Sequence, residues 1–493
     1  MGCGKRSPAR FARDLLIPDD SIKGRIMVVA LIILGLVIIT VLFHLYSPWW
    51  LTPLASNWGD IDTTIEISFW ITGFVFIAVN CFLAWVVWRY KYSGKHKAHY
   101  EPENKRLESW LIILTTIGVV AMLTPGLIAW ARVVNVPADA LTVEAIGQQW
   151  QWTFRFPGAD DKLGGADAKF VTPNNPYGVD PDDPAGQDDL IVDSHNLHVP
   201  VDKPIHLLLR SNDVLHNFAV PQFRVKMDLV PGTVTYQWFE PSRTGTFDIL
   251  CEELCGAAHF TMRGKITVEK DDKFKAWLSA QPSFAQTQRQ LPVDIVAGKS
   301  LYGNCAACHG MDGAGNEVLK APNLTGLESW YLSRQLRYFR DGVRGDHPAD
   351  LAGQQMAAMA KSVPEPEDVS NLIAYINTLV PQNVPSSLDG DADQGALVYQ
   401  TCATCHGANG QGNKALQAPQ LAGQADWYLY TQLKYFSMGW RGKHPEDQYG
   451  QQMRLMTGTI KNPQRLSDLL AFIATLPLPE QADNKIAQGT YQQ

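Results

Sequence analysis

Residues 251–262 read Cys-Glu-Glu-Leu-Cys-Gly-Ala-Ala-His-Phe-Thr-Met and place two thiols, an imidazole and a thioether in one short segment. Cys251 and Cys255 are four residues apart, His259 follows four residues later, and Met262 follows three after that. These soft and borderline ligands together favour copper. Two thiolates can bridge two copper ions, and each ion then needs an imidazole of its own. A disulfide is the alternative for the two cysteines, but it leaves the histidine and the methionine unexplained.

The second imidazole has to come from another part of the chain. His216 begins the apolar stretch His-Asn-Phe-Ala-Val-Pro at 216–221. A lone histidine in such a place is more often a structural or surface residue. Its pairing with the Cys/His/Met segment makes it the candidate for the missing ligand.

The surrounding region, 140–270, has the pattern of a β domain. The runs LTVEAIG, IHLLLRS, TVTYQWFE and GTFDILC are rich in β-branched and aromatic residues, and Pro-Gly and Asn-Asp turns separate them. This pattern predicts a sandwich or barrel. The stretch 157–193 is rich in Asp, Gly and Pro. We interpret it as a solvated insertion loop; a docking surface or a cation site is the alternative.

Three uncharged apolar runs precede the β domain, at 26–43, 67–88 and 109–131. Each is long enough, or nearly so, to cross the hydrocarbon core as a helix, and aromatic residues lie at their ends. Buried core helices are the alternative. The first run follows a long basic segment and no small-residue cleavage site follows it, so we expect a retained anchor rather than a cleaved signal.

The positive charges predict the orientation of these spans. Segments 1–25 and 89–108 each contain six Lys or Arg residues, and 47–65 contains none. Positively charged segments stay in the cytoplasm. We therefore expect a cytoplasmic N-terminus in the bacterial inner (cell) membrane and everything after residue 131 on the periplasmic or outer face.

The C-terminal part contains an internal repeat with an offset of 97 residues and no gap. CAACHG at 305–310 recurs as CATCHG at 402–407. Other residues recur at the same offset: Gly315 and Gly412, Pro322 and Pro419, Trp330 and Trp427, Arg344 and Arg441, Met356 and Met453. This pattern indicates a domain duplication.

Each copy contains a C-x-x-C-H motif, the attachment pattern of c-type haem. Two thiols form thioethers with the haem vinyl groups and the adjacent histidine reaches the iron. The motif residues are Cys305, Cys308 and His309 in the first copy, and Cys402, Cys405 and His406 in the second. A redox disulfide or a zinc half-site is the alternative. Two motifs at the same position of each repeat argue against it.

The second axial ligand of each haem should be a thioether, because a thioether raises the reduction potential of the haem iron. Met356 or Met359 can supply it in the first copy, and Met453 or Met456 in the second. Because each pair recurs, the duplication cannot choose between its members. A methionine that is not a ligand would be core filler.

Composition narrows the class of protein further. The chain has 493 residues and a formal net charge of −7. That length suits several domains, and the charge argues against a nucleic-acid-binding protein, which would normally have a basic face. A basic electron-carrier protein is a more natural partner for such a surface.

These motifs resemble two known families. Residues 213–221, 226–232 and 251–262 closely resemble the dinuclear copper (CuA) domain of cytochrome c oxidase subunit II. Each repeat, within about 295–478, resembles one half of the tandem dihaem class I cytochromes c, and aligning the terminal helix favours Met356 and Met453 as the axial ligands. The resemblance implies a cupredoxin fold for the β domain and an all-α fold for each repeat.

The resemblance also implies roles for single residues. Cys251 and Cys255 become bridging ligands, and His216 and His259 terminal ones. Met262 and the backbone carbonyl of Glu253 become weak ligands, and the Glu253 side chain helps to bind magnesium at the contact with subunit I. In Gln149-Trp150-Gln151-Trp152, Trp150 maps to the residue through which electrons enter; ordinary aromatic packing is the alternative.

The start of the last span also resembles the family. In Asn104-Lys105-Arg106-Leu107-Glu108, the carboxylate of Glu108 maps to the mouth of a proton channel. The family usually has Trp three residues later, whereas here Trp110 follows after two. A carboxylate that snorkels to the membrane interface is the alternative.

We therefore expect a multidomain chain with three transmembrane α-helices, a β-sandwich cupredoxin domain and two all-α class I cytochrome c domains. The expected boundaries are 1–25 for the basic N-terminus, 26–132 for the membrane region, 138–272 for the copper domain, 280–293 for a linker, and 294–381 and 391–480 for the haem domains.

The resemblance implies the electron-input subunit of a respiratory terminal oxidase. Electrons from a cytochrome c donor would pass through both haems and CuA to a haem–copper subunit I, which reduces oxygen with proton translocation beside subunit III. The chain itself has no oxygen site, because it lacks the many-span, histidine-rich bundle that such a site needs. The alternatives are the input subunit of a CuA-containing nitric oxide reductase and a stand-alone membrane electron-transfer protein. A quinol oxidase subunit is disfavoured, because that branch has lost the copper ligands.

Overall fold

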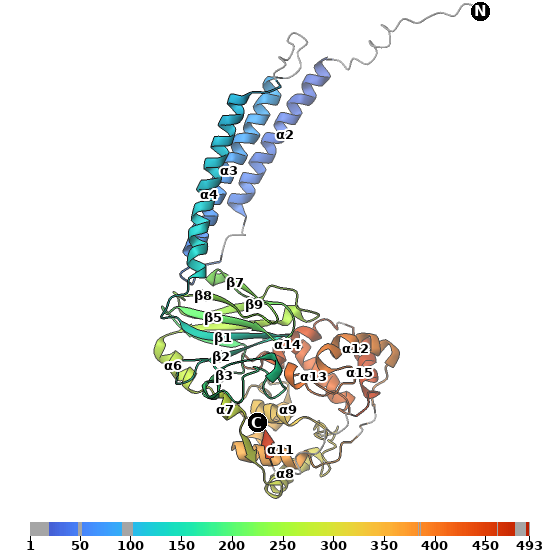
Figure 1. Cartoon of the computed structure of the whole chain (residues 1–493). Coiled ribbons are helices and arrows are strands. Elements are labelled where there is room, and N and C mark those ends of the chain that lie inside the picture. Colours follow the sequence, from blue (N-terminus) through green and yellow to red (C-terminus); the bar gives the residue numbers. More distant parts are fainter. Residues whose placement is uncertain are drawn as a thin grey trace, which may run out of the picture. The chain divides into compact units, whose positions relative to one another are not determined.

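The structure is a computed structural model that describes residues 19–47, 52–90, 102–382, 384, 386–460, 462–478 and 490–492. It forms two compact units (Figure 1). The first comprises Met1–Val136 with Gln222–Arg224, and the second comprises Pro137–Pro221 with Val225–Gln493. Most of the basic N-terminal segment and residues 91–101 lie outside the described residues.

Three long helices make up most of the first unit: α2 (Asp19–Tyr46), α3 (Gly59–Arg89) and α4 (Lys105–Val134). Each contains a stretch long and apolar enough to cross a membrane. The predicted runs 26–43, 67–88 and 109–131 lie inside these helices. Most of their large apolar side chains are exposed in the isolated chain, as expected for side chains that face lipid. The prediction of three apolar spans is confirmed.

Two five-stranded sheets form the β domain at the start of the second unit, with strand orders β3-β2-β1-β5-β8 and β4-β10-β9-β6-β7. The strands are β1 (Leu141–Gln148), β2 (Gln151–Phe156), β3 (Leu190–Val192), β4 (Asn196–Pro200), β5 (Ile205–Ser211), β6 (His216–Val220), β7 (Val225–Leu229), β8 (Thr235–Phe239), β9 (Gly245–Cys251) and β10 (Arg263–Glu269). Along β5 buried residues alternate with half-buried ones, and Ile205, Leu207 and Leu209 are fully buried. Such alternation places one face of a sheet in the core. The predicted cupredoxin-like sandwich is confirmed.

The Asp-, Gly- and Pro-rich stretch 157–193 differs from the solvated loop that the sequence suggested. It contains η1 (Ala168–Phe170), α5 (Pro184–Gln187) and β3, which pairs with β2. Tyr177 and Val179 are buried in a cluster with Ile146. Asp189 is buried as well and accepts a hydrogen bond from Arg155 at 2.7 Å. Local composition missed this packing because the partners lie in distant strands.

The polar stretch expected to be a linker, 280–293, is also folded. It contains α7 (Phe284–Thr287) and β11 (Gln290–Pro292), which pairs with β12 (Thr490–Gln492), and it follows α6 (Asp271–Ser279). Phe284 is buried beside Ile191, and its backbone N–H donates to the Asp189 carbonyl at 2.7 Å. The buried Phe284 side chain and backbone hydrogen bonds to Asp189 and Ile191 thus hold this otherwise polar segment against the β domain.

Two similar helical domains complete the second unit, as predicted. The first has α8 (Ile295–His309), α9 (Ser329–Arg340), α10 (Leu351–Ala360) and α11 (Pro366–Ile376). The second has α12 (Ala392–His406), η4 (Lys414–Leu416), α13 (Asp426–Met438), α14 (Gln448–Thr457) and α15 (Pro463–Ala474). The short helices η2 (Pro221–Phe223) and η3 (His259–Thr261) belong to the β region of the chain.

In each helical domain the first helix crosses the last one at a glycine. A Cβ atom added to Gly298 would lie 2.0 Å from the backbone oxygen of Asn371 in α11. In the second copy, a Cβ on Gly395 would lie 1.9 Å from the backbone oxygen of Asp468 in α15. Only glycine permits the two backbones to approach this closely.

The substitution Gly298→Ala should therefore destabilise the first helical domain by about 1–3 kcal/mol through overpacking. Gly303→Ala is the matched control, because it lies on the same helix and its added Cβ would meet nothing within 4 Å. That change should be neutral or stabilising by up to about 1 kcal/mol. Thermal unfolding followed by circular dichroism checks both, and equal behaviour of the two variants would contradict the close-approach explanation.

Candidate metal and haem centres

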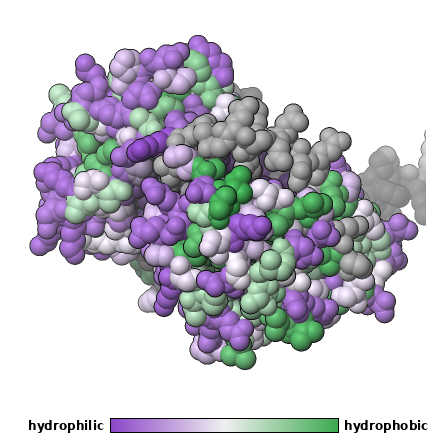
Figure 2. All heavy atoms as spheres, turned by 90° about the horizontal axis from the view of Figure 1, so that it is seen from below, coloured by the Kyte–Doolittle hydropathy of each residue, from purple (hydrophilic) through white to green (hydrophobic). Residues whose placement is uncertain are grey.

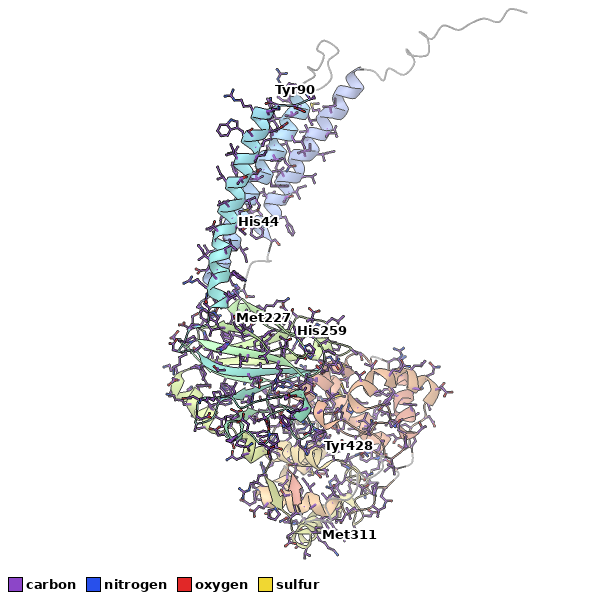
Figure 3. All side chains as sticks on the ribbon, viewed as in Figure 1. His44, Tyr90, Met227, His259, Met311 and Tyr428 are labelled. Carbon is purple, nitrogen blue, oxygen red and sulfur yellow. The ribbon has the colours of Figure 1, made fainter. Side chains whose placement is uncertain are left out.

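The predicted copper ligands converge at one end of the β domain. His216 is the first residue of β6, Cys251 is the last of β9, and the loop after β9 carries Cys255 and leads into η3. That short helix starts at His259, which Figure 3 labels in the β domain. The Sγ atoms of the two cysteines are 3.7 Å apart, which is a non-bonded separation. Nδ1 of His259 is 3.4 Å from the Cys255 Sγ, and Nδ1 of His216 is 4.0 Å from the Cys251 Sγ.

Weaker donors complete the set. The Met262 Sδ lies 3.8 Å from the Cys255 Sγ, and the Glu253 carbonyl oxygen lies 3.2 Å from the Cys251 Sγ. Met262 is buried and so is Cys255. Two thiols with an imidazole on each side, a thioether and a carbonyl oxygen suit a copper pair by the chemistry of the donors.

Asp213 holds the His216 ring and was not recognised as a site residue from the sequence. Its Oδ1 lies 2.8 Å from the His216 Nε2, so Nδ1 is the nitrogen that faces the cysteines. Its Oδ2 accepts the backbone N–H of Gln149 at 2.7 Å. Burial is the largest single effect and lowers the pKa of His216, but the hydrogen bonds and charges of Asp213 and Cys251 together raise the net pKa. A carboxylate that orients a ligand histidine is a usual outer partner of a metal site.

The carbonyl oxygen of Cys255 accepts two side-chain hydrogen bonds. Gln149 Nε2 donates to it at 2.7 Å, and Trp150 Nε1 donates to it at 3.2 Å. Gly256 follows with a φ of +121°, and a Cβ there would lie 2.7 Å from the Gln149 Nε2. The copper loop therefore has its conformation set partly by the segment at 149–150, which comes from another strand connection.

The two haem-attachment motifs occupy the last turns of α8 and α12. His309 Nδ1 lies 2.9 Å from the Pro322 carbonyl oxygen, and His406 Nδ1 lies 2.7 Å from that of Pro419. Both rings are thus oriented with Nε2 as the nitrogen left to bind a metal. Burial lowers the pKa of both histidines, which favours the neutral ring that a ligand needs. The four motif cysteines form no disulfide.

A cavity of about 850 Å³ connects both motifs. Its walls include Cys305 and His309 from the first copy and Cys402 and His406 from the second, and it is mainly apolar. The same cavity reaches three residues of the β domain: Trp150, Ala258 and Thr261. An enclosed apolar space next to each C-x-x-C-H motif fits a covalently held haem.

All four candidate axial methionines line this cavity. Met359 is 44% exposed, whereas Met356, Met453 and Met456 are half-buried. Of the first pair, the less exposed Met356 is thus the better placed to be shielded from water beside a haem.

A pair of arginines lies where the two copies meet. Arg344 donates to Gln335 of its own copy at 2.5 Å, and to Tyr428 and Gln432 of the other copy, each at 2.9 Å. Arg441 donates to Gln432 at 2.8 Å and across to Gln335 at 2.9 Å. Figure 3 labels Tyr428 at this junction. Within the described residues neither arginine forms an ion pair with a carboxylate within 4 Å, and both line the cavity, so both guanidinium groups could bind an anionic group there.

The second haem domain contacts the copper domain through α14, which packs against η3. Gln452, next to Met453, donates through Nε2 to the Trp150 carbonyl oxygen at 2.6 Å. Gln448 accepts the His195 backbone N–H at 2.6 Å, and the Ala415 carbonyl accepts the Gln151 side chain at 2.7 Å. Sequence reasoning had identified the repeat of Gln355-Met356 as Gln452-Met453, but could not assign the glutamine a contact.

The remaining predicted site residue, Glu108, lies in the first unit. It is exposed in the first turn of α4, and its backbone N–H donates to the carbonyl of Asn104, the N-cap residue, at 3.0 Å. No other ionisable side chain is bonded to it among the described residues. In the structure Glu108 is therefore an acidic residue in the first turn of a helix, where a negative charge is favourable.

Comparison with known proteins identifies two families in this chain. The family of the cytochrome c oxidase subunit II periplasmic domain matches residues 141–270. The cytochrome c family matches 295–380 and 392–477.

Two curated relatives carry the same assignment. The chain is 58% identical over 259 residues to an alternative cytochrome c oxidase subunit 2 of Bradyrhizobium diazoefficiens. The matched region covers 52% of this chain and 94% of that protein. It is 36% identical over 140 residues to a cytochrome c oxidase subunit 2 of Thermostichus vulcanus, which spans 28% of this chain and 33% of that protein.

Two solved structures are also similar. The periplasmic domain of cytochrome oxidase subunit II of Bradyrhizobium japonicum is 31% identical, with a TM-score of 0.21, over 29% of this chain and 95% of that one. Cytochrome c4 from Pseudomonas stutzeri is 25% identical, with a TM-score of 0.31, over 38% of this chain and 100% of that one.

The substitution Asp213→Asn should weaken copper binding about 10- to 100-fold, because a carboxylate that orients the His216 ring is replaced by a poorer acceptor. Asp248→Asn is the control, since Asp248 lies on β9 in an exposed ion pair with Lys265. Competition with a copper chelator measures the affinity of the full-length chain. Equal affinities in the two variants would show that Asp213 does not orient the ligand.

Proposed function

Because this chain belongs to the cytochrome c oxidase subunit II family, we propose that it is the electron-input subunit of a membrane-bound terminal oxidase. It is anchored by apolar helices and carries a periplasmic domain. Its families imply a CuA centre, haem c, a catalytic subunit I and cytochrome donors. Its activity is that of an oxidoreductase complex, and oxygen reduction belongs to subunit I.

One observation carries this proposal: the cavity that joins both haem-attachment motifs ends at Trp150, beside the copper loop. The cofactors supply the redox chemistry when bound, and they would relay electrons from the first haem to the second and then to copper. The chain's own residues hold them in that order. Trp150 is 5% exposed, so it is covered rather than presented to solvent.

The contacts of Trp150 support its role in this relay. Its carbonyl accepts the Gln452 side chain at 2.6 Å, and its indole N–H donates to the Cys255 carbonyl at 3.2 Å. Gln452 adjoins Met453, and Cys255 is a copper ligand in the proposal. Short bonded steps therefore connect the second haem pocket to the copper pocket through one aromatic residue.

Other residues would position the haems. We propose Met356 and Met453 as axial thioether ligands opposite His309 and His406. The paired arginines, Arg344 and Arg441, would hold haem propionates, because these are the anionic groups of a haem and both guanidinium groups lie in the cavity wall. Sharing Gln335 and Gln432 between them would also fix the two haem domains relative to each other.

Finer features of the family are part of the proposal. The Glu253 backbone carbonyl, 3.2 Å from the Cys251 Sγ, would be a weak copper ligand. By the family resemblance, the Glu253 carboxylate would help to bind magnesium at subunit I. Glu108 would lie at the mouth of a proton channel, supported by its position at the start of α4. Proton translocation, a subunit III partner, a cytoplasmic N-terminus and the bacterial inner membrane complete the proposal, on the basis of the basic segments 1–25 and 89–108.

The complex itself provides the main test. Purified through a tag on this chain, it should contain a haem–copper subunit I, two haems c per chain, and the near-infrared band and EPR signal of a mixed-valence copper pair. A partner with a haem–non-haem iron centre would instead indicate a nitric oxide reductase. Recovery of the chain alone, without other haem types, would overturn the oxidase assignment.

The substitution Trp150→Phe should slow the reduction of the copper centre while the haems are reduced at the normal rate, because the indole N–H link to Cys255 is lost. Stopped-flow absorption at the haem and near-infrared copper bands separates the two steps. Trp277→Phe is the control, since Trp277 stacks on His198 at 4.3 Å in the same domain and lines no part of the cavity. An unchanged rate of copper reduction in the Trp150→Phe variant would show that Trp150 only packs in the core.

A further inference from the structure

One face of the haem domain is packed against the β domain in the second copy and exposed in the first. In the second domain this face includes residues 414–417, Gln448 and Gln452, and it lies against the β domain. Its contacts are the Ala415 carbonyl with Gln151 at 2.7 Å, Gln448 with His195 at 2.6 Å, and Gln452 with Trp150 at 2.6 Å. This face is therefore the one through which a haem domain of this chain meets a redox partner.

The equivalent face of the first domain lies 97 residues upstream and is open. Val318, the counterpart of Ala415, is 88% exposed, and Leu351, the counterpart of Gln448, is 68% exposed. Leu319 is 47% exposed and Met359 is 44% exposed. We call these four residues the open haem face.

The open haem face adjoins the first haem pocket. Leu319 and Met359 also line the cavity, as does the haem-attachment cysteine Cys308. In the second domain the residues of the copper domain, including Trp150 and Ala258, complete the cavity wall. The first domain's part of the cavity is bordered by the second haem domain, since the Lys320 Nζ lies 5.3 Å from the ring centre of Trp427 and both residues line the cavity. Val318 and Leu351 nevertheless stay exposed.

Four exposed apolar side chains around a cofactor pocket are unfavourable in water unless a partner covers them in function. Figure 2 shows the second unit from below, where apolar residues form patches between polar ones. Weak electron-transfer encounters bury small interfaces, which a patch of this extent can supply. The nearby exposed residues Glu317 and Lys320 carry opposite charges, so no single sign of charge dominates the rim.

We propose that the open haem face is the docking surface of the external electron donor, a c-type cytochrome whose exposed haem edge is framed by apolar side chains. The inference rests on the proposed electron-input function and adds the order of transfer. Trp150, whose indole N–H donates to the Cys255 carbonyl in the copper loop, is 5% exposed and bonded to Gln452 of the second haem domain, so an outside donor meets the first haem domain instead. The second haem domain is the internal partner of copper.

Paired charge substitutions test this surface in the purified complex. Val318→Glu with Leu351→Glu, and separately Val318→Lys with Leu351→Lys, should each lower the second-order rate of haem reduction by reduced cytochrome c about tenfold. Neither residue lines the haem cavity. Because apolar contact is lost in both, the two signs of charge should act in the same direction at high ionic strength, where steering is screened.

The matched control is Val296→Glu. Val296 is 79% exposed and lies at the start of α8, at the opposite end of that helix from the haem motif. It should leave the rate with cytochrome c unchanged. A small-molecule reductant should reduce the haems at the same rate in every variant, and the same should hold for the rate of copper reduction. Failure of that reduction in the unmodified complex would count against the proposed function, not against the docking surface.

Three results would overturn the inference. Unchanged rates in both double variants would place the donor elsewhere. Opposite effects of Glu and Lys at high ionic strength would make the contact electrostatic rather than apolar. Dissociation of a dimer by the double variants, with no loss of donor rate, would show that a second copy of this chain covers the face.

Discussion

A hydrogen bond between Gln452 and Trp150 joins segments 302 residues apart in the chain, and the arrangement of the electron-transfer centres depends on it. The tryptophan is fixed on its other side by the Cys255 carbonyl, next to a glycine whose missing side chain leaves room for Gln149. Buried polar groups need partners. The copper loop, the aromatic residue and the helix that carries Met453 therefore satisfy one another, and a shift of one would leave unpaired groups in the other two.

The two haem domains have the same arrangement of helices, but they differ in the domains that they contact. Their helices begin at positions 97 residues apart, and both cross at a glycine. Yet the second copy replaces Val318 and Leu351 by Ala415 and Gln448, residues that fit against the β domain with hydrogen bonds. The paired arginines at the junction bind across the copies. The second copy thus packs against the β domain, and the corresponding residues Val318 and Leu351 of the first copy are exposed.

Where expectation and structure differ, the cause is long-range packing. The stretches 157–193 and 280–293 are polar in composition, and composition predicts a loop and a linker. Phe284 and Tyr177 nevertheless lie in one buried cluster with Ile146, and Asp189 pairs with the buried Arg155. A few apolar side chains and one buried ion pair decide the outcome, and neither is visible in a local window of sequence.

The sequence alone determined the chemistry of the sites. Residue type and short spacing specify which atoms can bind copper or haem, so the cysteine, histidine and methionine sets could be named at once, as could the apolar spans and the 97-residue repeat. Only the tertiary structure decided how those sites are related. It brought Gln149 to Cys255 and Gln452 to Trp150, and it covered one haem face while leaving its copy open. Such contacts depend on which surfaces meet across hundreds of residues. The differences between the copies, such as Val318 against Ala415 and Leu351 against Gln448, acquire a meaning only when the surface opposite them is known.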